Sequence, residues 1–131
     1  MNQYNEQIPQ DLLKKVAFTY FADIVYRERL YMLKPEEQTD YKLIREFMKG
    51  EVNSTEFVSK IRAQQKSLQT YLEGIGTMNT LLNEYKPQML DVAKKLPEVP
   101  DEALTLVIKE LKVPIEQLVL FLEQQYPRKV N

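Results

Sequence analysis

Residues 12–26 read LLKKVAFTYFADIVY, and a helix built from them is apolar on almost every side. At about 100° per residue one wide apolar stripe forms, and further apolar side chains cover much of the remaining circumference. A helix of this kind is expected to be surrounded by other helices. We therefore predict a helix from about Pro9 to Lys34, about 38 Å long, that serves as the spine of a bundle.

Glycine and proline residues divide the rest of the chain into further helical segments. We predict these helices at residues 35–49, 53–73, 77–96, 101–112 and 114–125, with a short connector at 96–100. Pro87 should kink or split the helix at 77–96, because proline lacks a donor and clashes with the preceding turn. The last two segments, on either side of Val113, are either one kinked helix or two elements.

No alternation of apolar and polar residues is long enough to predict a strand. The predicted fold class is therefore all-α: a single-domain bundle of about five or six helices around a long, mostly buried first helix. Residues 9–126 form the predicted domain, residues 1–8 a flexible N-terminal segment, and residues 127–131 a C-terminal tail.

The composition restricts the chemistry, because the chain contains no cysteine and no histidine. Thiolate nucleophiles, disulfides, the usual neutral-pH base and most transition-metal sites are thereby excluded. Two groups of carboxylates lie at predicted helix starts, where they complement the helix dipole, and lack the spacing of a calcium loop: Glu36, Glu37 and Asp40, and Glu98, Asp101 and Glu102. We predict no enzymatic activity, no cofactor and no metal site.

The charges are balanced, with 18 basic and 19 acidic residues. Binding to nucleic acid needs a concentrated basic face, so we expect none. The longest apolar run, residues 118–122, is too short to span a membrane. The polar N-terminus has no signal-peptide pattern, and we expect a cytoplasmic protein without a membrane partner.

Asp23 and Arg27 lie four residues apart within or beside the most apolar arc of the first predicted helix. The simpler interpretation is an ion pair on the helix surface, worth a few tenths of a kcal/mol. The alternative is a buried polar pair held for specificity or for a ligand. Tyr20 and Tyr31 would then contribute hydroxyl groups to a small-ligand pocket.

Residues 41–66 form a helix, a glycine turn and a second helix that starts at Asn53. They could be a DNA-binding helix-turn-helix, with polar and basic side chains facing the duplex: Ser54, Ser59, Lys60, Arg62 and Lys66. Glu51 and Glu56 would meet the phosphates, so an antiparallel helical hairpin is the simpler interpretation. The pattern of Phe, Gly and Glu at residues 47–57 also resembles a segment of small helical immunity proteins from bacterial toxin systems.

The apolar run at residues 118–122 covers every face of a helix, so at least Leu120 has no use on a helix with one buried side. Either the helix is packed on both sides within its own domain, or it presents apolar surface to a second chain. The predicted interface contains Val119, Leu120 and Tyr126, and twofold self-association is the commonest outcome. The favoured function is a non-catalytic interaction module of the adaptor, chaperone-like or inhibitor type, with the helix-turn-helix and the ligand pocket as alternatives.

Overall fold

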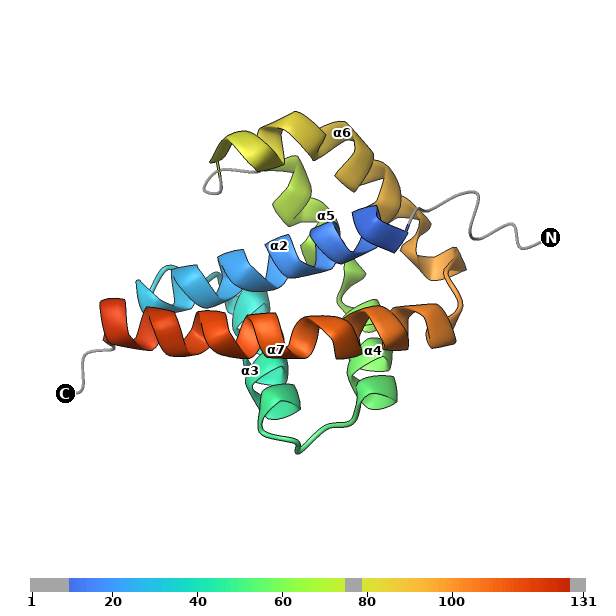
Figure 1. Cartoon of the computed structure of the whole chain (residues 1–131). Coiled ribbons are helices and arrows are strands. Elements are labelled where there is room, and N and C mark those ends of the chain that lie inside the picture. Colours follow the sequence, from blue (N-terminus) through green and yellow to red (C-terminus); the bar gives the residue numbers. More distant parts are fainter. Residues whose placement is uncertain (1–9, 75–78, 128–131) are drawn as a thin grey trace.

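The computed structural model describes residues 10–74 and 79–127, which contain six α-helices, one 3-10 turn and no strand (Figure 1). The elements are α2 (Gln10–Arg29), α3 (Pro35–Met48), α4 (Ser54–Ala63), α5 (Gln65–Glu73), α6 (Asn79–Lys95), η1 (Leu96–Glu98) and α7 (Asp101–Gln125). The predicted all-α fold class is thereby confirmed. The predicted flexible segment at 1–8 and most of the predicted tail lie outside the described residues.

Helix α2 is the central element of the bundle, as predicted. It packs against α7, α6, α3 and α5, and Figure 1 shows α2 and α7 side by side. Eleven of its twenty residues are buried, and the seven consecutive residues 19–25 are buried without exception. Seven residues make about two helical turns, so every side of α2 is covered there by another helix.

The end of α2 differs from the prediction, because the helix stops at Arg29 and not at Lys34. Tyr31 adopts a left-handed backbone conformation with φ 59°. The N–H groups of Tyr31 and Met32 donate to the carbonyls of Glu28 and Arg27 at 3.0 and 2.8 Å. This double hydrogen bond is the Schellman ending, in which glycine usually takes the left-handed position.

The predicted helix at 53–73 is two helices, because the chain leaves the helical conformation at Gln64 (φ −103°, ψ 16°). Asn53 caps α4 by accepting a hydrogen bond from the N–H of Glu56 at 2.8 Å, as expected from the spacing. The break coincides with a gap in the apolar pattern, since Gln64 and Gln65 stand where a continuous helix would need core residues.

The two prolines inside predicted helical regions do not interrupt them. Helix α6 continues through Pro87 and curves along its length in Figure 1, and α7 continues through Pro114 as one helix of 25 residues. Both prolines are exposed, so their rings lie away from the core. The core itself includes a stacked pair, Phe47 and Phe57, with ring centroids 4.5 Å apart.

Candidate functional site

Asp23 and Arg27 belong to a buried ion-pair cluster between α2 and α3. The Asp23 side chain is 1% exposed and the Arg27 side chain 13%. Arg27 Nε donates to Asp23 Oδ2 at 2.7 Å, while Nη1 and Nη2 donate to the two carboxylate oxygens of Glu37 at 2.6 and 2.7 Å. The interpretation as a surface ion pair is therefore wrong, because α3 covers the side of α2 that carries the pair.

The hydrogen bonds of this cluster keep Arg27 and Glu37 charged. Burial would raise the pKa of Glu37, but the hydrogen bonds from Arg27 and from the Lys34 backbone N–H hold that pKa below its usual value. Burial would lower the pKa of Arg27, but the hydrogen bonds to Glu37 and Asp23 raise it. Glu37 therefore does more than cap α3, because it fastens α3 to α2 through a two-pronged contact with Arg27.

Asp40 lies deeper at the same junction and is fully buried. The Tyr20 hydroxyl donates to Asp40 Oδ2, a carboxylate that the prediction did not pair with Tyr20. Asp40 Oδ1 and the Tyr71 hydroxyl have no hydrogen-bond partner among the described residues. Burial raises the pKa of Asp40 to about 7, and burial followed by the charge of Asp23 raises the pKa of Tyr71.

Tyr31 lines a different, open polar pocket, together with Glu28, Tyr41 and Arg45, and not the junction that holds Asp23 and Arg27. It follows the end of α2, and 55% of its side chain is exposed. Sequence reasoning also missed Tyr71, and it interpreted Glu37 and Asp40 only as carboxylates at a helix start. A signal was present, because residues 37, 40, 41 and 44 recur at helical spacing and two of them are carboxylates on the face that Tyr41 and Ile44 bury.

A second polar group, buried at Arg29 and partly buried where it reaches α7, joins α2, α3 and α7. Arg29 donates from Nη2 to Glu28 Oε1 at 2.7 Å and to the Tyr41 hydroxyl at 2.9 Å. Arg45 on α3 donates to Glu123 on α7 at 3.0 Å. These contacts between charged groups hold α2, α3 and α7 together. The Arg27 cluster does the same for α2 and α3.

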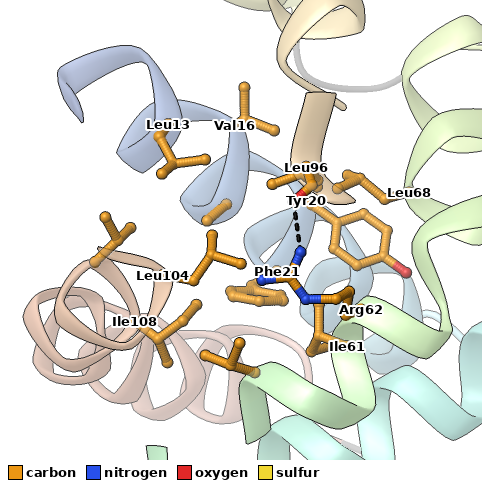
Figure 2. Close-up of a pocket in the computed structure, with 13 residues that line it drawn as sticks. Leu13, Val16, Tyr20, Phe21, Ile61, Arg62, Leu68, Leu96, Leu104 and Ile108 are labelled. Atoms are coloured by element: carbon orange, nitrogen blue, oxygen red, sulfur yellow. Dashed lines mark hydrogen bonds between the residues drawn. The ribbon is translucent and has the colours of Figure 1, made fainter. Parts of the chain in front are cut away.

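Arg62 has a structural role that removes it from a DNA-binding face. Its guanidinium donates to the carbonyls of Leu96 and Val99 at 2.5 and 2.9 Å and to Asp101 Oδ1 at 2.7 Å. Figure 2 shows Arg62 beside an apolar cavity, with its hydrogen bond to Leu96 drawn as a dashed line. Arg62 thereby fastens the connector between α6 and α7 to α4.

The cavity in Figure 2 lies between α2, α4 and α7 and measures about 40 Å³. Its walls are apolar side chains, among them Leu13, Phe21 and Leu104. A cavity of about 150 Å³ is what a benzene-sized molecule needs. This space is therefore a packing defect and too small for an organic ligand.

The outer face of α7 and the residue that follows the helix carry most of the large apolar side chains that the bundle leaves uncovered. Among the residues whose burial the structure describes, seven large hydrophobic residues are exposed, and five of them lie there: Leu106, Val113, Leu120, Phe121 and Tyr126. Three of them, Leu106, Val113 and Leu120, are each seven residues apart and 54–57% exposed. Because seven residues bring a helix back to within about 20° of the same direction, these three form one straight row. We call them the α7 row.

The predicted interface of Val119, Leu120 and Tyr126 is thereby corrected at one position. Leu120 and Tyr126 are exposed, whereas Val119 is 4% exposed and packs in the core. Consecutive residues point about 100° apart on a helix, so Val119 and Leu120 face opposite environments. The possibility that α7 is packed on both sides within its own domain is wrong, because the described residues leave the row uncovered.

No protein-family model, no curated protein and no solved structure matches this chain significantly. Among the helices of residues 10–74 and 79–127, none is both long and apolar enough to cross a membrane. Those same residues contain no group of three or more acidic side chains placed to hold a metal ion.

Proposed function

We propose that this protein is a non-catalytic helical interaction module that presents the outer face of α7 to another protein. The observation that carries the proposal is the α7 row, Leu106, Val113 and Leu120, which the chain itself leaves more than half exposed. Burying apolar surface is favourable by about 25 cal/mol per Å². A partner that covered the row would supply what the bundle does not.

The other candidate site residues support this proposal, because their charged groups already bind partners within the fold. The buried charges of Asp23, Arg27 and Glu37 bind one another, and Arg62 binds the α6–α7 connector. The chain has no cysteine and no histidine, and histidine is the side chain that enzymes use most often for acid–base catalysis. A cytoplasmic location stays a prediction from the sequence.

Site-specific photo-crosslinking in cells of the native host tests the proposal. p-Benzoyl-phenylalanine replaces Val113 on the row, or Glu73 on α5 as an exposed control. We expect an adduct of one defined mass from position 113 and none from position 73. The adduct should disappear when Leu106→Ser and Leu120→Ser are added, because the flanking row residues would no longer bind. No adduct from position 113, or equal adducts from both positions, would contradict the proposal.

A further inference from the structure

We propose that the protein bound by the α7 row is a second copy of this chain, whose α7 packs antiparallel to the first about a twofold axis at Val113. This inference rests on the proposed function, because it uses the same face. A twofold contact is self-complementary: if residue i touches residue j of the second copy, then j touches i. The sequence of α7 satisfies this condition in its apolar row, in its charges and at a backbone carbonyl.

The apolar row is symmetric about Val113. Leu106 precedes Val113 by seven residues and Leu120 follows it by seven, about 10.5 Å in each direction. In an antiparallel pair Leu106 meets Leu120 of the second copy, Val113 meets itself, and Leu120 meets Leu106. Three apolar layers form without an insertion or a shift in register.

The charges beside the row are also symmetric. Relative to Val113, Lys109 and Glu116 both lie on one flank of the helix, about 40–60° around its axis. A twofold axis normal to the two helices brings equal flanks together, so Lys109 faces Glu116 of the second copy at nearly the same height. The pair occurs twice per dimer. Lys109 and Glu116 are both exposed, and neither has an ion pair within the described part of the chain.

The charges nearest to this pair are already engaged within the chain. Glu110 binds Lys14 on α2, and Glu123 binds Arg45 on α3. Lys112 lies over the ring of Phe47, 5.1 Å from its centroid. Lys109 and Glu116 are therefore the charges along the middle of the row that remain available for a second copy.

The opposite flank offers a hydrogen bond at the same register. Pro114 has no N–H, so the carbonyl of Glu110 lacks the donor that it would have in an uninterrupted helix. Glu110 and Gln117 lie on one flank, on the other side of the row from Lys109. In the antiparallel pair the side-chain amide of Gln117 of the second copy lies opposite this carbonyl and can donate to it. Pro114 therefore leaves the Glu110 carbonyl without its usual donor, and Gln117 of the second copy supplies a donor in the dimer.

The size of the contact predicts a weak dimer. A standard stable interface buries about 800 Å² on each partner. Half-exposed side chains along one helix offer less than this, so we expect association in the micromolar range or weaker. The dimer should therefore depend on concentration, and charge changes on the flank should shift it measurably.

Charge reversal on the full chain tests the register. We expect sedimentation velocity to show a monomer–dimer equilibrium over micromolar to millimolar concentrations. Lys109→Glu and Glu116→Lys should each weaken dimerisation by roughly three- to tenfold, because each breaks two contacts. The double variant should restore it, since both pairs re-form with reversed sign. Lys94→Glu on α6 is the control and should leave dimerisation unchanged. A monomer at all concentrations, or a double variant weaker than either single one, would overturn the inference.

Cysteine crosslinking tests the direction, since the natural chain has no cysteine to interfere. We expect Leu106→Cys and Leu120→Cys chains to form a disulfide dimer only when the two are mixed. A disulfide in either variant alone would indicate a parallel pair and contradict the proposal. The photo-crosslinking experiment separates the two claims. An adduct from position 113 with twice the mass of the 15.5 kDa chain supports both. An adduct with a different protein overturns self-association and leaves the interaction function intact.

Discussion

The α2–α3 junction and the outer face of α7 distribute polarity in opposite ways. At the junction, ionisable side chains are wholly or largely buried: Asp23, Arg27, Glu37 and Asp40. On α7, Leu106, Val113 and Leu120 are exposed to water. The difference lies in their partners, because most of the buried polar groups find each other within the chain and the exposed apolar groups do not. The junction is therefore explained by folding alone, whereas the described part of the chain leaves the row uncovered, which is why we assign a second molecule to it.

Removal of Arg27 should lower the free energy of unfolding more than any other substitution in this comparison, because it disrupts the α2–α3 junction. Arg27→Met leaves the carboxylates of Asp23 and Glu37 buried without their cation. We expect a loss of about 3–5 kcal/mol in the free energy of unfolding, measured by urea denaturation. Lys109→Met on the exposed flank of α7 is the matched control and should change it by less than about 0.5 kcal/mol. Equal effects of the two variants would contradict the burial of the cluster.

The raised pKa of Asp40 should make the stability of the protein depend on pH. Its pKa is raised to about 7 in the folded state from its usual value of 3.8, so the native protein holds a proton that the unfolded chain has lost. This contribution is fully present below the unfolded pKa and disappears as the pH rises through 7. We expect the free energy of unfolding of the natural protein to fall, relative to Asp40→Asn, by up to about 1.4 kcal/mol per pH unit between pH 5 and 7.

Urea denaturation at several pH values measures this difference. The asparagine side chain of the Asp40→Asn control cannot ionise, but its carbonyl can still accept the Tyr20 hydrogen bond. The stability of Asp40→Asn should therefore lack the Asp40 contribution, and other titrating groups cancel in the comparison. Parallel stability curves for the two proteins would show that Asp40 titrates normally.

Two neighbouring residues on α7 test the exposed half of the comparison. Val119→Ala removes buried methyl groups and should cost roughly 1–3 kcal/mol in the free energy of unfolding. Leu120→Ala removes a larger side chain but should cost less than about 0.5 kcal/mol in the monomer, because this side chain is more than half exposed. Thermal or urea denaturation at low protein concentration, where self-association is absent, measures both. A larger loss of stability from Leu120→Ala than from Val119→Ala would mean that Leu120, and not Val119, lies on the buried face of α7.

The smallest expected effect concerns Tyr31, an exposed aromatic residue at a strained position. Its φ of 59° is unfavourable for a residue with a Cβ atom. Tyr31→Gly should raise the free energy of unfolding by about 0.5 kcal/mol, after the greater freedom of glycine in the unfolded chain is subtracted. Tyr31→Ala keeps the Cβ atom and should give no such gain. A loss of stability in both variants would mean that the tyrosine side chain contributes more than its backbone costs.

Local patterns in the sequence were sufficient for the fold class and for most helices. The periodicity of residues 12–26 identified the central helix, and the Asn53 cap and the glycines marked helix ends, because hydrogen bonds within a helix join residues near in sequence. The candidate interface was partly predicted in the same way. Five apolar residues in a row at 118–122 exceed what one face can bury, which indicated Leu120 as surplus.

The rest depended on contacts between segments far apart in the chain. Whether Asp23 and Arg27 lie at the surface is decided by α3, which brings Glu37 against them. The rotation of α7 against α2 and α4 decides that Val119 is buried and Leu120 exposed. The same packing carries α7 past Pro114, although proline disfavours a helix interior. Periodicity shows which residues share a face of a helix, and only the neighbouring helices determine which face is covered.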